Sequence, residues 1–165
     1  MKIAFCSDVH LEFGNLVLNN TENAEEATIF GSRIESIGSD VTVVAVSIMV
    51  LEAKRAANYL KNYGISVEII DLHSVSHYDS KMIMESVRKT GKLLILDTSW
   101  IKYGIASEVN RVINEVSPEI LKKPTKSLGM EFAPCPTSKA LEDLYYPDIN
   151  DIAREIIKLH NSESE

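Results

Sequence analysis

Cysteine, glycine and proline are all scarce in this sequence. The 165 residues include 2 cysteines, Cys6 and Cys135, which lie far apart and in no Cys-x-x-Cys spacing. That spacing excludes a disulfide framework and a zinc site built on cysteine pairs, and we expect two free thiols in a reducing cytoplasm. With 7 glycines and 5 prolines, the chain carries no low-complexity segment and no solenoid repeat.

Positive charge is scarce as well. The chain has 17 Lys and Arg against 24 Asp and Glu, a net charge of -7. A protein that neutralises nucleic-acid phosphates needs a cationic face. The small lysine cluster at Lys122, Lys123 and Lys126 is flanked by Glu119 and Glu131. We therefore expect no nucleic-acid partner.

Long hydrophobic runs are missing too. The longest, over 41–51, is interrupted by Thr42 and Ser47, and it is far shorter than the roughly 20 apolar residues that cross a bilayer. The N-terminal region carries Lys2 but no cleavable apolar segment. We therefore expect no membrane association and a cytoplasmic location. The hydrophobic fraction of 45% and the charged fraction of 25% are typical of one globular domain with a full core.

The sequence does contain a repeating strand–helix pattern. Residues 41–46 are nearly all β-branched and apolar, which predicts a strand covered on both faces. The following residues place small and apolar side chains on one face of a helix: Val50, Ala53, Ala57 and Leu60. Gly64 is expected to end this helix as a left-handed cap, and 67–72 to form the next strand. Two strands joined in this way are predicted to be parallel.

The same unit repeats further along the chain. Asp79 is expected to cap a second helix, which stops at Gly91 and buries one apolar face: Ile83, Met84 and Val87. A third buried strand over 93–96 ends at Asp97 and leads into a loop over 98–104.

Two further amphipathic helices follow. The first buries Ile105, Val109, Val112, Ile113 and Val116. The second begins after Asp148 and buries Ile149, Ile152, Ile156 and Leu159. A short helix is expected over 138–145, and short strands over 32–37 and 125–128.

This alternation predicts an α/β fold, a three-layer α/β/α domain with a mostly parallel sheet of about five strands. The domain is expected to cover 27–160. An irregular arm over 1–26 precedes it, and a tail over 161–165 follows it.

A possible metal site lies near the N-terminus. Asp8 and His10 form an Asp-x-His pair directly after an expected strand, and a carboxylate with an imidazole suits a divalent metal. The stretch MKIAFCSDVHLEFG resembles the opening of a calcineurin-like metallophosphoesterase. The later GDxxD and GNHE or GNHD motifs of that family are absent. The alternatives are a relic of a metallophosphoesterase or an arm with no metal.

Several polar and aromatic residues follow the expected parallel strands. Asp71, His73, Asp97 and Trp100 are predicted to lie at the carboxyl edge of the sheet, where open α/β sheets bind ligands. Such a carboxylate binds a ligand hydroxyl or satisfies the amides of its own loop. Trp100, with Ile101 and Tyr103, is a candidate interface anchor. The loops of phosphate-binding and dinucleotide-binding proteins are absent.

The order of motifs over 27–160 resembles the C-terminal domain of the transketolase superfamily. The matching stretches are GSRIESIGSDVTVVAVSIMVLEAKRAANYL, GISVEIIDLHSVSHYDSKMIMESVRKTGKLLILD, GIASEVNRVINE and PCPTSKALEDLYYPDINDI. The nearest likeness is to beta subunits of 2-oxo acid dehydrogenases, the pyruvate and branched-chain enzymes. The resemblance implies a five-stranded sheet whose edge strand, here 32–37, runs antiparallel. It departs at His73, Ser76 and His77, where the family usually has Arg, a basic residue and Pro.

The resemblance also implies a role for the chain. In that family, thiamin diphosphate and Mg²⁺ lie between two other domains, one of which carries a GDG motif that this sequence lacks. No cofactor is therefore expected on this chain, and no catalysis by it alone. We expect an assembly domain that forms a homo-oligomer, or joins the cofactor-binding domains of such an enzyme. A small-ligand module at the strand ends and a metallophosphoesterase relic remain the alternatives.

Overall fold

The computed structural model describes residues 31–130 and 132–161. Its strands are β1 (Arg33–Ser36), β2 (Val41–Ala45), β3 (Val67–Asp71), β4 (Leu93–Trp100) and β5 (Lys126–Met130). Its helices are α2 (Ile48–Lys61), α3 (Ser80–Thr90), α4 (Ile105–Val116), the 3-10 helix η2 (Pro118–Ile120), α5 (Lys139–Tyr145) and α6 (Ile149–Asn161). The metal candidates Asp8 and His10 lie outside the described residues.

The strands form one mixed sheet in the order β1-β3-β2-β4-β5. β2 runs parallel to both β3 and β4, and β4 runs parallel to β5. β1 lies at the edge, antiparallel to β3. The prediction of a mostly parallel five-stranded sheet with one antiparallel edge strand is therefore confirmed.

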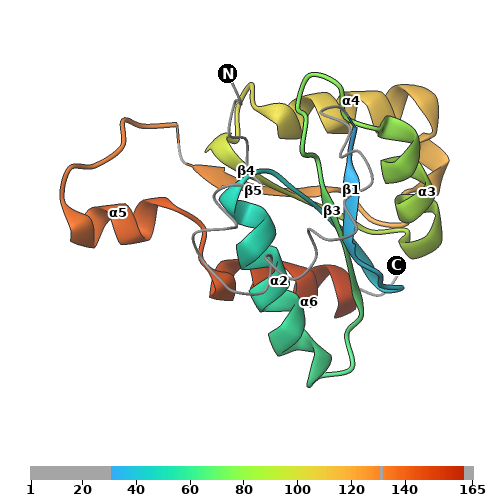
Figure 1. Cartoon of the computed structure of the whole chain (residues 1–165), viewed down its shortest axis with the longest axis horizontal. Helices are drawn as coiled ribbons and strands as arrows, with labels where there is room; N and C mark the ends of the chain where they lie inside the picture. The colour runs from blue at the N-terminus through green and yellow to red at the C-terminus, as the bar shows by residue number, and fades with distance from the viewer. Residues whose placement is uncertain (1–30, 131, 162–165) are drawn as a thin grey trace, which may run out of the picture.

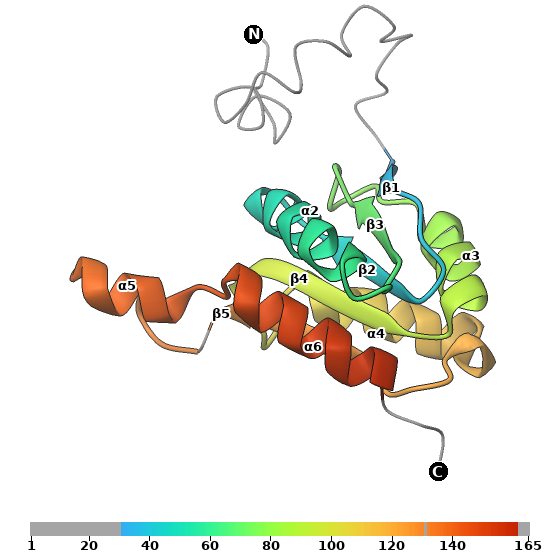
Figure 2. The same ribbon diagram turned by 90° about the horizontal axis from the view of Figure 1, so that it is seen from below.

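Helices cover both faces of this sheet (Figure 1). On one face, α2 and α6 pack side by side, and Val43 of β2 points into their core. On the other face, α3 and α4 pack over Val44 of the same strand. Figure 2 shows the same separation of the helices in a second view. The alternation of side chains along β2 explains why every one of its residues is buried, and the predicted three-layer architecture is confirmed.

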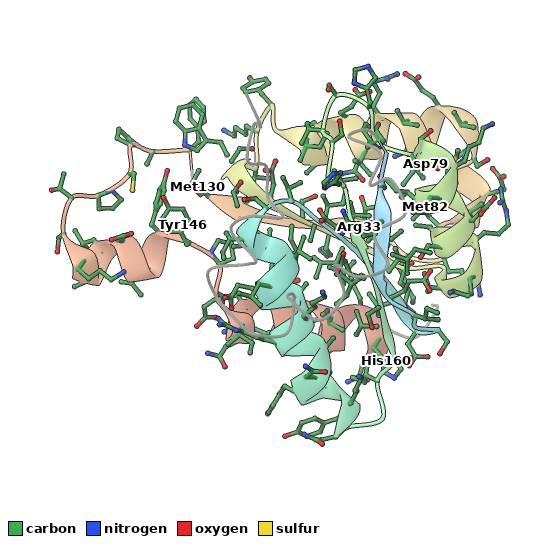
Figure 3. All side chains as sticks on the ribbon, viewed as in Figure 1. Arg33, Asp79, Met82, Met130, Tyr146 and His160 are labelled. Carbon is green, nitrogen blue, oxygen red and sulfur yellow. The ribbon has the colours of Figure 1, made fainter. Side chains whose placement is uncertain are left out.

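The expected caps form at two helices. The Asp79 carboxylate accepts the N–H groups of Lys81 and Met82 at 3.0 and 3.1 Å, at the start of α3 (Figure 3). The Asp148 carboxylate accepts two N–H groups at the start of α6 in the same way. The longest of the described helices, α2, has 14 residues. No helix in the described part of the chain is long and apolar enough to span a bilayer.

Several boundaries differ from the prediction. β4 continues beyond Asp97 to Trp100, because β5 extends alongside it and pairs Met130 with Trp100 after an irregularity in the register. The loop expected over 98–104 is therefore shorter. Val116, expected to be buried, is exposed at the last position of α4.

Two helix ends also differ from the prediction. α2 ends at Lys61, so Gly64 adopts its left-handed φ of 75° in the turn beyond the helix rather than as its cap. Asn161, assigned to the tail, is the last residue of α6.

A buried polar network joins β2 and β3 to α3. The Thr42 hydroxyl lies 2.7 Å from both the Ser86 and the Thr90 hydroxyls. Beside it, the buried Glu68 carboxylate accepts hydrogen bonds from Lys89 and from the Gly38 N–H. Burial opposes ionisation of Glu68, but these hydrogen bonds and one with Ser86 outweigh burial and hold the pKa of Glu68 below its usual value.

Candidate interaction surface

The carboxyl edge of the sheet is where the loops after β2, β3 and β4 meet. α2 leaves β2 toward one face, whereas α3 and α4 leave the neighbouring strands toward the other face. Neighbouring loops that diverge in this way leave room for a partner or a ligand. Three described residues other than glycine have a positive φ, and all three lie in these loops: Ser47 (57°), His73 (52°) and Tyr103 (64°). Such backbone is uncommon for residues other than glycine, and strained positions of this kind cluster at functional sites.

Asp71 and His73 lie on the β3 side of this edge. Asp71 is buried, and its carboxylate accepts the His73 N–H at 2.8 Å. Burial raises the pKa of Asp71, and this hydrogen bond offsets part of the rise. The register pairs Asp71 with Arg33 of the edge strand. On its other side Asp71 pairs with Ala45 of β2, so it lies in the interior of the sheet rather than on an edge strand.

Asp97 lies on the β4 side and is engaged by its own loop. Its carboxylate accepts the Ser99 N–H at 3.0 Å, the Ser99 hydroxyl at 2.7 Å and the Ile105 N–H at 3.0 Å. The last bond caps the start of α4 and ties that helix to β4. Gly104 packs so closely here that a Cβ atom would lie 2.6 Å from the carboxylate. These contacts give Asp97 a structural part in shaping the edge.

The structure brings these residues to one edge but not into one cluster. β2 lies between β3 and β4, so Asp71 and Asp97 are two strand spacings apart, about 10 Å. Trp100 and Tyr103 lie on the Asp97 side, and His73 lies on the Asp71 side. Among the residues that the structure describes, no three His, Cys, Asp or Glu side chains are grouped to hold a metal.

Trp100 forms the centre of an aromatic cluster beyond the end of β4. Its indole N–H donates to the Ala133 carbonyl at 3.3 Å and to the Tyr145 hydroxyl at 3.2 Å. The Tyr145 hydroxyl donates to the same carbonyl at 2.6 Å. The Phe132 ring packs edge-on against Trp100 with a centroid distance of 4.7 Å. These contacts close the base of a protruding segment, residues 132–148, which we call the arm.

The arm carries α5 away from the domain. Both views show α5 beyond the β5 side of the sheet, with no other helix beside it (Figures 1 and 2). Figure 3 shows Met130 and Tyr146 at the base of the arm, where the chain leaves and rejoins the domain. Cys135 is exposed there, with its sulfur 3.7 Å from the Tyr146 hydroxyl. No described side chain of α5 is buried in the core.

Exposed apolar side chains concentrate on the arm and on residues 100–103, the end of β4 and the start of the loop after it. Seven of the thirteen large exposed hydrophobic residues of the described chain lie in these two segments: Trp100, Ile101, Tyr103, Phe132, Leu141, Leu144 and Tyr146. Trp100 is 41% exposed, Leu144 84% and Tyr103 90%. Large apolar patches of this kind mark interaction sites on soluble domains. The sequence reasoning singled out the first three residues and missed those of the arm.

One signal in the sequence pointed to the arm residues. Leu141 and Leu144 are three positions apart, which puts them on the same side of the short helix expected over 138–145. Nothing in the sequence told whether that side faces the core or the solvent, because the answer depends on how far the arm stands from the sheet.

A three-layer α/β/α domain with an exposed surface at its strand ends matches one known class of domain. The family model of the transketolase C-terminal domain matches residues 31–152 of the chain. The chain belongs to the transketolase C-terminal domain family, as the order of its motifs predicted.

Relatives of this family include subunits of larger enzymes. The mitochondrial pyruvate dehydrogenase E1 component subunit beta-2 of Oryza sativa subsp. japonica is 37% identical over 123 residues, which are 74% of this chain and 33% of that protein. The pyruvate dehydrogenase E1 component subunit beta of Rickettsia bellii is 30% identical over 139 residues, which are 84% of this chain and 43% of that protein.

A solved structure shares the fold as well. A split gene transketolase, described as an inactive beta4 tetramer, matches with a TM-score of 0.68 and 27% sequence identity over 78% of this chain and 40% of that chain. The chain thus spans between a third and about two fifths of the length of the relatives it matches.

Proposed function

We propose that this chain acts as the assembly domain of a thiamin-diphosphate-dependent enzyme of the 2-oxo acid dehydrogenase type. Oxidative decarboxylation of the 2-oxo acid is assigned to cofactor-binding domains that assemble with it. Two relatives are named as beta subunits of pyruvate dehydrogenase, and that likeness supports the choice of a 2-oxo acid over a sugar substrate.

The observation that carries this proposal is the apolar surface at the strand ends and the arm. Trp100, Tyr103 and Leu144 expose large side chains that a free-standing domain gains nothing by exposing. Aromatic and leucine side chains of this kind form the buried centre of protein–protein interfaces. A surface covered by another subunit accounts for them.

Cofactor binding is assigned to the partner domains. A diphosphate held by Mg²⁺ requires several oxygen ligands around one point. The described residues do not fit such a site, because the two buried carboxylates of the edge, Asp71 and Asp97, lie on opposite sides of β2. No step of the reaction is therefore assigned to residues of this chain. A cytoplasmic location is part of the proposal, and cell fractionation tests it.

Co-purification from the native cells tests the assembly role. The tagged chain is expected to bring down a chain with a GDG motif, and the complex is expected to decarboxylate a 2-oxo acid only when thiamin diphosphate and Mg²⁺ are supplied. A Trp100→Ala variant should lose the complex. Tyr63→Ala, which removes an exposed aromatic side chain in the turn after α2, should keep it. Purification of the intact chain with no such partner, or a complex without that activity, contradicts the proposal.

A small-ligand site at the carboxyl edge is a second candidate. The positive φ angles of Ser47, His73 and Tyr103 in three adjacent loops support it. Titration calorimetry with nucleotides and sugar phosphates is expected to show binding that a His73→Gly variant alters. An absence of heat across the whole panel contradicts this second function and leaves the first intact.

A further inference from the structure

We propose that a cluster of lysines at the amino edge of the sheet binds an acidic peptide segment of a partner protein. The cluster consists of Lys92, Lys122, Lys123 and Lys126, and we call it the lysine edge. It lies at the end of the sheet opposite to the loops after β2, β3 and β4, because Lys92 directly precedes β4 and Lys126 begins β5. The inference therefore goes beyond the proposed function, which rests on the other end of the sheet.

The fold brings these lysines together from two segments of the chain. Gly91 ends α3 with a φ of 72°, and its carbonyl accepts the Lys122 N–H at 2.8 Å. Lys126 pairs with Leu94 in the parallel ladder of β4 and β5, directly beyond Lys92 and Leu93. The sequence alone grouped Lys122 with Lys123 and Lys126, and the structure adds Lys92 to them.

None of the four lysines is paired with a carboxylate of the residues that the structure describes. The lysines that form ion pairs in that part of the chain are Lys54, Lys89, Lys139 and Lys158. In a chain with a net charge of -7, a group of cations without acidic partners is an exception. Cations that the chain itself does not neutralise are available to an acidic partner.

Two of these side chains are already held in place by the domain. The stem of Lys122 lies across Gly91, since a Cβ atom on this glycine would come within 2.5 Å of the Lys122 Cδ atom. The Lys92 ammonium donates to the carbonyl of His160, which Figure 3 labels near the end of α6, at 3.1 Å. An ammonium group has three donors, so Lys92 keeps donors for a ligand. Side chains that are ordered beforehand lose less entropy when they bind.

The surroundings of the lysine edge favour a peptide over a nucleic acid. Proteins that bind single-stranded nucleic acid stack its bases on aromatic rings. The exposed rings at this end of the described sheet, Tyr59 and Tyr63, precede β3, which is three strand spacings from β5, or about 14 Å. The exposed apolar side chain beside the lysine edge is instead Val116, at the end of α4 and against η2. An aliphatic side chain beside cations fits a peptide that carries both acidic and apolar residues.

Screening by salt explains how an acidic chain binds an acidic segment. At physiological salt the field of a charge falls off over about 8 Å. A short segment on the lysine edge therefore meets these cations and little of the acidic surface elsewhere. A long polyanion would extend beyond the cluster and be repelled by that surface.

Fluorescence anisotropy with a short synthetic peptide of glutamate and leucine residues tests this surface on the intact chain. Binding is expected at low salt and should weaken as salt is added. The double variant Lys122→Gln and Lys126→Gln should bind the peptide on the order of 10-fold more weakly. Lys61→Gln with Lys81→Gln is the matched control, because both lysines are exposed and lie outside the cluster, and it should bind as the wild type does.

Two further measurements separate charge from structure and peptide from nucleic acid. The double variant Lys122→Arg and Lys126→Arg keeps both charges and should bind as the wild type does, and a short DNA duplex should bind more weakly than the peptide. The inference is overturned by a wild-type chain that does not bind the peptide, by a glutamine variant that binds it as tightly, by an arginine variant that binds no better than the glutamine variant, or by tighter binding of the duplex. Co-purification with the cofactor-binding chain depends on none of these results.

Discussion

Replacing Gly104 with alanine tests how the end of β4 is built. The backbone of Gly104 is extended, with a φ of -80°, so alanine is not strained there by its dihedral angles. Space is the obstacle. A Cβ atom would lie 2.6 Å from the Asp97 carboxylate, 2.6 Å from the Trp100 carbonyl oxygen and 2.7 Å from the Ser99 hydroxyl. Since none of these distances is tolerated, the carboxylate or the chain around Trp100 must move.

The cost follows from the bonds that such a movement breaks. Losing the Asp97 bond to the Ile105 N–H removes the cap of α4, worth about 1 kcal/mol. Disturbing the remaining bonds of a buried carboxylate adds about 1–3 kcal/mol. Alanine also lowers the conformational entropy of the unfolded chain, which stabilises the folded protein by about 0.4–1 kcal/mol. Gly104→Ala should therefore lower the free energy of unfolding by about 1–3.5 kcal/mol.

Urea unfolding followed by circular dichroism measures this loss. Gly64→Ala is the comparison, because a Cβ atom there meets nothing within 4 Å and only the positive φ opposes it, at a cost of about 1–2 kcal/mol. A Gly104→Ala protein as stable as the wild type, to within about 0.5 kcal/mol, would refute the reasoning.

Two further predictions concern the buried polar network. Thr42→Val removes two hydrogen bonds of 2.7 Å, so the Ser86 and Thr90 hydroxyls each lose one buried partner. Urea unfolding should therefore show a loss of about 1–3 kcal/mol in the free energy of unfolding. An unchanged midpoint contradicts this. The pKa of Glu68 is lower in the folded chain than its ordinary value of 4.5, so its stabilisation is present above pH 4.5 and is lost as the pH falls through the folded pKa. In Glu68→Gln, the free energy of unfolding should therefore fall less steeply with decreasing pH in this acid range. A variant with the same pH dependence as the wild type would show that the Glu68 carboxylate and its bond to Lys89 do not supply this stabilisation.

The sheet and its helices were predictable from local sequence. The β-branched run at β2, the capping carboxylates of Asp79 and Asp148 and the left-handed Gly91 each act over a few residues. Because these signals depend only on neighbouring residues, they predict local structure without knowledge of the tertiary fold. The family resemblance then supplied the antiparallel edge strand, which the structure shows as β1 beside β3.

The parts that were missed depend on contacts distant in sequence. β4 reaches Trp100 because β5 pairs with it some thirty residues later, and no local pattern shows that pairing. Val116 has the spacing of a buried residue, but it is the last residue of α4 and its side chain is 60% exposed. Trp100 donates hydrogen bonds to Ala133 and Tyr145, which lie more than thirty residues further along the chain. Its contacts at the base of the arm could therefore not be predicted from the residues next to it.

Amide hydrogen exchange of α5, measured as a function of chain concentration, tests the central claim most directly. The claim is that another subunit covers the arm. Protection of the amides of Lys139–Tyr145 should rise with concentration, in step with the mass of the assembly, while the amides of β2 stay protected throughout. Arm amides that exchange at the same rate at concentrations where the chain is single and where it is assembled would contradict the account.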